Sequence, residues 1–246
     1  MELTEQLNFD HEDRRDIYDY VEAHGEVRAD RARRALNLDP EAFGHHVTIL
    51  RRDGYIRREG ETLRVAYREE DVEEHDAADL TYTIRAAQQR DLSGLIGVIR
   101  SVAEEGTYIE AETVADLLDH EEVILRHNEV RSRMVFVACV DEDVVGWVHL
   151  DLPETAKLAH TAVLTVGLLP TYRDHGIGSA LLDRGIRWAC EHDFEKLYNS
   201  VPATNEAAIE FLEAHGWETE AVREDHYRIG DEYVDEVMLA SFLDCA

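Results

Sequence analysis

The chain has 246 residues, with 54 Asp and Glu against 25 Lys and Arg, and a formal net charge of −29. Its hydrophobic share of 44% is enough for one large core or two smaller ones, which argues against an acidic disordered chain. No run of about 18 apolar residues occurs, and the acidic N-terminus lacks the apolar segment of a signal peptide, so we expect a cytoplasmic protein without membrane contact.

Residues 1–70 are expected to form a first domain of three helices and a β-hairpin. Apolar residues recur at helical spacing in residues 11–25 and 28–39. A third helix is expected in residues 39–54, since an aspartate followed by a proline is a typical helix start. Two alternating runs in residues 55–67 are separated by a short glycine-containing stretch, as in a hairpin.

This order of three helices and a hairpin resembles a winged helix-turn-helix domain, and so does the stretch "VTILRRDGYIRREGETLRV". The resemblance implies that the third helix enters the major groove of DNA while the hairpin touches phosphates or the minor groove. The candidate DNA-contacting side chains are His45, His46, Arg51 and Arg52 on the helix, and Arg57, Arg58 and Arg64 on the hairpin. Domains of this shape also dock proteins or dimerise, and arginines can simply solvate an acidic protein, so DNA binding and docking both stay open.

Charge separates this first part from the rest of the chain. Residues 1–70 carry a net charge of −5, with 12 basic and 17 acidic side chains, and residues 71–246 carry −24, with 13 and 37. The stretch "REEDVEEHDAADL" lies between them, and we expect residues 71–80 to be a solvated acidic linker. A second domain then occupies residues 81–246.

The second domain alternates expected strands and helices, which is typical of an α/β fold. In chain order we expect a strand at residues 81–87, helices at 91–106 and 111–130, a strand pair at 133–152, a strand at 157–170, a helix ending at Ala189, a strand at 195–201, a helix at 205–216, and strands at 217–229 and 232–242.

The stretch "LLPTYRDHGIGSALLDRGIRWA", residues 168–189, places a glycine turn between a strand and a helix. Backbone N–H groups and the helix dipole make such a turn an anion site. Gly176 and Gly178 remove side chains there, so a phosphate can reach the amides. The turn lacks the Lys-Ser/Thr of a P-loop and the spacing of a dinucleotide fingerprint.

Together with "VPATNEAAIEFLEAHGWETEAV", this stretch resembles the GNAT family of acetyl-CoA-dependent N-acetyltransferases. The resemblance covers residues 81–243 and implies an α/β (α+β) fold with a mixed central sheet and flanking helices. It also implies that the turn holds the CoA pyrophosphate, that the preceding strand binds pantetheine and the acetyl carbonyl, and that an asparagine contacts the cofactor. The acetyl-CoA-binding residues carried over are Val166, Gly167, Leu168, Arg173, Asp174, His175, Gly176, Ile177, Gly178, Ser179 and Asn205.

Two positions depart from the family pattern and leave the general acid and base unassigned. Leu212 stands where many relatives have a tyrosine that protonates the departing thiolate, and Val163 stands where some carry a glutamate base. The candidate catalytic residues are His160, on the same strand, and Glu105, in the loop between the first two helices of the domain. Tyr108 in that loop is a candidate for amine binding. A structural role for His160 and a plain surface role for the loop residues stay open.

These features favour one function over two alternatives. We expect an N-acetyltransferase in which a primary amine of unknown identity attacks acetyl-CoA directly and a strand amide holds the oxyanion. One alternative is a DNA-binding transcriptional regulator whose GNAT-like domain senses acetyl-CoA or another ligand. The other is a protein acetyltransferase that docks its target through the first domain. The oligomeric state stays open, although many relatives form homodimers, and we expect no metal, since the sequence shows no ligand cluster.

The cysteines and lysines of the chain indicate in which redox and salt conditions the protein works. Cys139, Cys190 and Cys245 are odd in number and far apart, and they match no disulfide framework or zinc spacing. The only lysines are Lys157 and Lys196, and an acidic, lysine-poor surface resembles halophilic proteins. At about 1 M salt the Debye length is about 3 Å, so acidic groups would repel one another little and mainly preserve solubility. An ordinary acidic protein in low salt is the open alternative.

Overall fold

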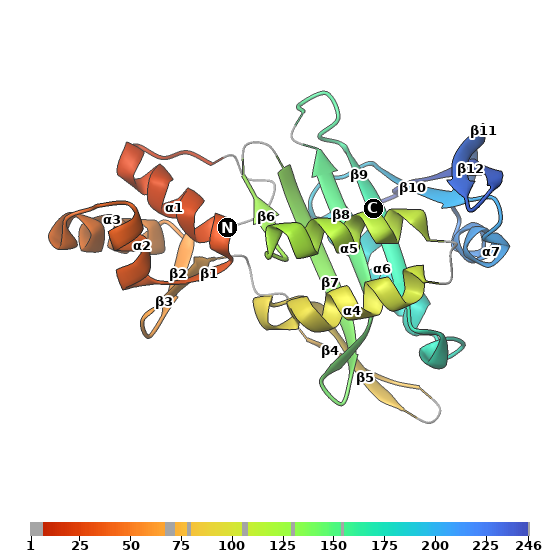
Figure 1. Ribbon diagram of the computed structural model, residues 1–246, viewed down its shortest axis with the longest axis horizontal. Helices are drawn as coiled ribbons and strands as arrows, with labels where there is room; N and C mark the ends of the chain where they lie inside the picture. The colour runs from red at the N-terminus through yellow and green to blue at the C-terminus, as the bar shows by residue number, and fades with distance from the viewer. Residues whose placement is uncertain are drawn as a thin grey trace.

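The computed structural model describes residues 7–66, 72–77, 80–104, 108–128, 131–153 and 155–245. A small N-terminal unit lies beside a larger unit that is built around one sheet (Figure 1). None of the described helices is long and apolar enough to cross a membrane.

The N-terminal unit contains the three expected helices and the hairpin, and one short strand that the sequence did not predict. Its elements are α1 (Glu12–His24), β1 (Glu26–Arg28), α2 (Ala29–Ala35), α3 (Pro40–Arg52), β2 (Ile56–Glu59) and β3 (Thr62–Val65). The strands form an antiparallel sheet in the order β1-β3-β2. Asp39 caps α3 as expected, since its carboxylate accepts hydrogen bonds from the N–H groups of Glu41 and Ala42. Ile17 and Val47 lie in the core that the helices share.

The larger unit follows the expected alternation of strands and helices. Its elements are β4 (Glu73–Asp76), β5 (Thr81–Ala86), the short η1 (Gln89–Asp91), α4 (Leu92–Ala103), α5 (Ile109–Glu121), β6 (Arg126–His127), β7 (Arg131–Val140), β8 (Asp143–Pro153), β9 (Thr161–Leu168), the short η2 (Pro170–Tyr172), α6 (Ile177–Glu191), β10 (Lys196–Pro202), α7 (Glu206–Ala214), β11 (Glu218–Ile229) and β12 (Glu232–Phe242). The strand order is β11-β12-β10-β9-β8-β7-β5-β4, and β6 pairs with β7 outside this path.

Helices cover both faces of the sheet. In Figure 1, α4 and α5 lie on the near face, and α6 lies behind the sheet. The sequence of β7 explains why both faces are apolar. Met134 and Phe136 belong to the core that includes α6, whereas Val135 and Val137 belong to the core beneath α4 and α5. Because successive side chains of a strand point to opposite faces, one continuous apolar run supplies both layers.

The parallel strands β9 and β10 pair only at their first residues. In the described strands the register begins at Thr161 opposite Lys196 and ends at Val163 opposite Tyr198. On its other side β9 stays paired with β8 as far as Leu168. The two strands therefore diverge toward their carboxyl ends, and backbone groups on the facing edges are left for another partner.

Part of the expected acidic linker is a strand. Residues 73–76 form β4 at the edge of the sheet, antiparallel to β5. The carboxylate of Glu73 pairs with Arg184, at 3.2 Å from its Nε, and with Arg187, both of α6. Arg184 is buried and lies over the ring of Phe136. The linker expectation is wrong for these residues, because arginines of a distant helix neutralise an acidic run that looks solvated in the sequence.

Two expected elements are shorter in the structure. The helix expected over residues 111–130 ends at Glu121, because Glu122 adopts a left-handed conformation with φ of 56°. The strand expected over residues 157–170 begins only at Thr161, whose N–H donates to the carbonyl of Leu158 in a turn.

The expectation of unpaired cysteines is also corrected. Cys190 and Cys245 form a disulfide, and Cys139 is free and buried. The C-terminal tail returns to the end of α6, a proximity that cysteine spacing cannot reveal.

A buried carboxylate joins the two units. Glu22 of α1 is only 4% exposed. It accepts hydrogen bonds from Arg126 Nη1 at 3.0 Å, from the backbone N–H of His127 at 3.1 Å and from the side chain of Asn128 at 3.1 Å. The hydroxyl of Tyr18 donates to the carbonyl of His127 at 2.9 Å. The N-terminal unit is thus held against β6 by directional, partly charged bonds.

Candidate active site

A cavity of about 510 Å³ opens where β9 and β10 diverge. Its walls include residues 165–168 of β9 and 199–202 of β10, together with residues at the N-terminal ends of α5, α6 and α7. Each helix N-terminus carries partial positive charge. Three such ends around one cavity of small-molecule size favour an anionic or strongly polar ligand.

The glycine turn forms the wall at the start of α6. Gly176 is the N-cap of α6 with φ of 78°, and no described side chain caps the helix. A Cβ at Gly176 would meet nothing within 4 Å, and one at Gly178 would touch only the ring of Phe211 at 3.7 Å. Packing therefore does not require Gly178, and space for a ligand against the backbone explains it better. The first N–H groups of α6 can bind an anion here.

Most of the expected turn residues line the cavity. Those that do are Arg173, Asp174, Gly176, Gly178 and Ser179. The other two have different positions. The side chain of Ile177 is buried in the core, and the Nδ1 of His175 bonds to the carbonyl of Arg173 at 2.7 Å. Ser179 also bonds to the Nε2 of His215 on the loop after α7, at 3.0 Å.

The strand before the turn contributes Val166, Gly167 and Leu168 to the cavity, as expected. Gly167 has a packing reason as well. A Cβ there would lie 2.1 Å from the ring of Trp147, which is opposite it on β8. The buried indole leaves no room for a side chain at this position. Gly167 also lines the cavity.

Asn205 and Leu212 come to the cavity from opposite ends of α7. Asn205 is the N-cap of α7 and accepts a hydrogen bond from the N–H of Ala208 at 3.2 Å. Leu212 is buried, so an apolar side chain occupies the place where the family pattern has a tyrosine.

Glu110, in the first turn of α5, lines the cavity and was missed by sequence analysis. Burial raises the pKa of its carboxyl group, the charge of Glu236 raises it further, and His226 acts in the opposite direction. A carboxyl group with a raised pKa beside a cavity is typical of a catalytic acid or base. The local sequence gives no signal for it, because Glu236 is on the distant strand β12.

Glu236 is held in place by three side chains of β11. It is 3% exposed, and its carboxylate pairs with Arg223 Nη1 at 2.9 Å and with His226 Nε2 at 3.5 Å. The hydroxyl of Tyr227 donates to it at 3.2 Å. Burial and the carboxylates of Glu236 and Glu110 raise the pKa of Tyr227, so its hydroxyl stays protonated. The β11–β12 hairpin thus places fixed negative charge near Glu110.

Of the two expected catalytic residues, the structure describes only His160, which does not line the cavity. His160 is exposed and precedes β9, at the end of the strand away from the cavity. Its carbonyl accepts the N–H groups of Glu195 and Lys196, which is a structural role. Glu105 lies outside the described residues. Tyr108, proposed for amine binding, does line the cavity.

The candidate DNA-contacting residues are largely engaged within the protein. His46 is buried rather than exposed and pairs with Asp13, because it faces the start of α1. Three arginines contact neighbouring carboxylates, Arg52 with Asp53, Arg58 with Glu61 and Arg64 with Glu59. His45 and Arg51 are exposed on α3, and Arg57 is half-buried on β2. The acidic neighbours offset much of the positive charge that DNA would require.

The fold is that of the GNAT acetyltransferases. The structure of yncA from Salmonella typhimurium with its cofactor acetyl-CoA superposes with a TM-score of 0.54 at 17% identity, over 66% of this chain and 94% of that chain. Residues 99–217 match the Acetyltransferase (GNAT) family, and this part of the chain is a GNAT acetyltransferase domain.

Named relatives match part of the chain. The L-amino acid N-acetyltransferase AaaT of Escherichia coli (strain K12) is 27% identical over 106 residues, which are 42% of this chain and 65% of that protein. The N-alpha-acetyltransferase of Sulfurisphaera tokodaii is 28% identical over 162 residues, 61% of this chain and 89% of that protein. The chain spans 65%, 55% and 50% of the lengths of the first three curated relatives that it matches.

Proposed function

We propose that the protein transfers an acetyl group from acetyl-CoA to a primary amine. The observation that carries the proposal is the cavity between the diverging strands β9 and β10, which ends at the glycine turn and uncapped N-terminus of α6. An anion site next to an open strand edge fits a ligand with a pyrophosphate at one end and an amide-rich chain behind it.

The residues around the cavity fit acetyl-CoA, which supplies an activated acetyl thioester when bound. The N–H groups that follow Gly176 would hold the pyrophosphate, and Gly178 leaves room for it. The free edge of β9 at Val166 to Leu168 would bond the pantetheine amides and polarise the acetyl carbonyl. Asn205 would contact the cofactor from the start of α7.

Glu110 is our proposed general base, in place of His160 and Glu105. An amine must lose a proton to attack a thioester, and a carboxylate with a raised pKa is a better base near neutral pH than an ordinary one. Tyr108 and Glu110 lie on the same turn, so the amine would bind between them and the β11–β12 hairpin. Leu212 cannot donate a proton, so the thiolate would leave without a side-chain acid from that position.

The acceptor that we propose is the α-amino group of an amino acid or of a protein N-terminus. The names of the E. coli and S. tokodaii relatives support this class of amine. The carboxylate of Glu110 in the wall of the cavity supports a cationic substrate in its resting ammonium form, whereas the charge of Glu236 is offset by Arg223.

For residues 7–66 we propose a winged-helix type of domain with a docking role, in a cytoplasm of high salt. The order of three helices followed by a hairpin supports the type. The pairing of its arginines with acidic neighbours supports docking over DNA binding. The net charge of −29 with two lysines supports the salt-rich setting.

An acceptor screen tests the proposed activity. The full chain is incubated with acetyl-CoA and a panel of amino acids and N-terminal peptides, and both the acetylated product and the released thiol are measured. We expect one class of amine to be acetylated with equal thiol release, and a Gly178→Trp variant to be inactive. The control is Glu191→Trp at the exposed end of α6. Acetyl-CoA binding without acetylation of any amine would contradict an enzyme and support the ligand-sensing alternative.

A further inference from the structure

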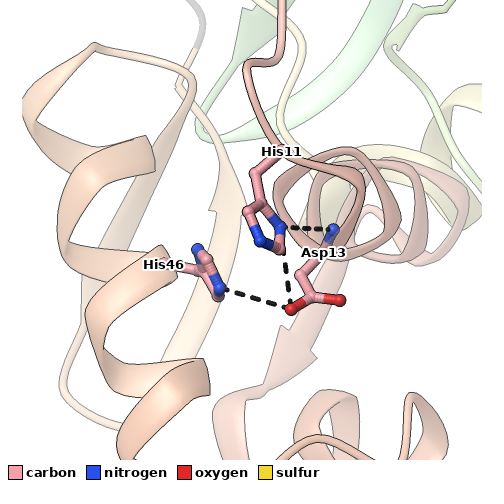
Figure 2. A group of neighbouring side chains, drawn as sticks. All are labelled: His11, Asp13 and His46. Carbon is pink, nitrogen blue, oxygen red and sulfur yellow. Dashed lines mark hydrogen bonds and ion pairs between the residues drawn. The ribbon is translucent and has the colours of Figure 1, made fainter.

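Three potential metal ligands meet in the N-terminal unit, although the sequence analysis expected none (Figure 2). His11 is the N-cap of α1, Asp13 is in its first turn, and His46 is on α3. The Nε2 of His46 lies 3.3 Å from Oδ2 of Asp13, and Nδ1 of His11 lies 3.7 Å from the same oxygen. One donor atom from each residue falls within 4.8 Å of the other two.

An ion pair and a helix cap explain this cluster only in part. His11 caps α1 by accepting the N–H of Asp13 at 3.1 Å, but serine, threonine, aspartate and asparagine are the preferred caps. His46 is 7% exposed, and its Nδ1 has no hydrogen-bond partner among the described residues. Burying an imidazole costs free energy, and a bond from Nε2, the ring nitrogen that faces Asp13, to an ion would offset part of it. The two imidazole rings also lie 4.6 Å apart, so both can approach one ion.

We propose that His11, Asp13 and His46 bind a divalent transition-metal ion of the zinc class. Zinc takes imidazole nitrogen and carboxylate oxygen at about 2.0–2.1 Å, which places tetrahedral ligands about 3.3 Å apart. The separation of 3.3 Å between His46 and Asp13 matches this geometry. The exposed ring of His11 has room to turn toward the ion, with its side chain 50% exposed. The carboxylate offsets part of the dication's charge, and the two imidazoles supply nitrogen ligands.

The ion would fasten the start of α1 to the middle of α3. A solvent molecule would complete its coordination, since His11 is exposed and Asp13 is partly so. This site belongs to the N-terminal unit and is separate from the cavity of the acetyltransferase domain. Its role is structural, and the proposal does not depend on acetyl transfer.

Titration of the metal-free full chain tests the site. After treatment with a chelator, the protein is titrated with Zn²⁺ by calorimetry, and with Co²⁺ to read the absorption of a tetrahedral ion. The variants are His11→Ser, which retains a good helix cap, and Asp13→Asn, which retains size. The matched control is His45→Ser, because His45 is the exposed neighbour of His46 on α3.

We expect one equivalent of Zn²⁺ to bind the wild type and the His45→Ser variant with the same affinity. Loss of groups that only orient metal ligands weakens binding by about 10–100-fold, so loss of a ligand in His11→Ser or Asp13→Asn should cost at least that much. Zn²⁺ should also raise the Tm of the wild type but not of these two variants. The proposal is overturned if the wild type binds no stoichiometric Zn²⁺, or if both variants bind it as tightly as the wild type.

Discussion

The carboxyl group of Glu110 is the group at the cavity whose protonation we expect to control the rate. Burial and the Glu236 charge raise its pKa, so the basic form accumulates only above a pH higher than for an ordinary glutamate. If it is the base, kcat/KM of the wild type rises as the pH increases through this raised pKa. Glu110→Gln should lower kcat/KM by about 10²–10⁴-fold and remove this acidic limb.

Glu112→Gln is the matched control, because Glu112 is exposed on the same helix. It should leave both the rate and the pH profile unchanged. A Glu110→Gln enzyme that keeps the acidic limb would show that another group takes the proton.

Individual residues also show what sequence reasoning could and could not predict. The glycines of the turn line the cavity, and the sequence points to this turn because strand–glycine–helix order is a local pattern. The same reasoning could not see that Gly167 is needed for the ring of Trp147, which is a contact between strands. It also missed Glu110, because the carboxylate that perturbs it, Glu236, is distant in the chain.

Among the elements, α1 should depend most on the buried carboxylate of Glu22. Glu22→Ala removes one of the carboxylate partners of Arg126. It also removes the acceptor of the hydrogen bonds that the backbone N–H of His127 and the side-chain amide of Asn128 donate to Glu22. Breaking a buried ion pair costs about 3–5 kcal/mol, so the free energy of unfolding should fall by that order in urea denaturation. Glu26→Ala, at an exposed position on β1, should change it by less than about 0.5 kcal/mol.

A loss below about 1 kcal/mol in Glu22→Ala would mean that the bonds between the units are dispensable. If the N-terminal unit alone became susceptible to proteolysis, the larger unit would be independently stable. Cleavage spread over the whole chain would instead show that the two units unfold together.

Element boundaries illustrate the limits of local patterns. Periodicity found every helix of the N-terminal unit, because each has an apolar face of its own. It did not find β4, because the strand EEHD has no apolar residue and Glu73 is paired with Arg184 and Arg187 of the distant helix α6. It also extended α5 past the left-handed residue Glu122, since a non-glycine residue in that conformation has no clear sequence signature.

The whole molecule carries a charge of −29, and this should make its stability depend on salt. The Debye length falls from about 10 Å at 0.1 M to about 3 Å at 1 M, so repulsion among separated acidic groups is screened over this range. The Tm should therefore rise between 0.1 M and 1 M KCl.

Sucrose at matched osmolality serves as the control, because sucrose is excluded from the protein surface but does not screen charge. A smaller rise of the Tm in sucrose than in KCl would show that the effect of KCl is electrostatic. A Tm that is unchanged or lower in KCl would contradict the high-salt setting that the composition suggests.

At the scale of the molecule, the sequence predicted the α/β class and the strand–turn–helix that builds the cavity, because both rest on periodicity and glycine placement. It could not predict the disulfide between Cys190 and Cys245 or the ion pair between Arg126 and Glu22, since both depend on how distant segments meet.

The most direct test of the account is calorimetric titration of acetyl-CoA into the full chain in about 1 M KCl, where surface charges are screened. The wild type and Glu191→Trp should bind one equivalent with the same affinity. Gly178→Trp should not bind, because its indole would occupy the space beside the start of α6. Absence of binding to the wild type, or equal binding by Gly178→Trp, would contradict the assignment of this cavity to acetyl-CoA.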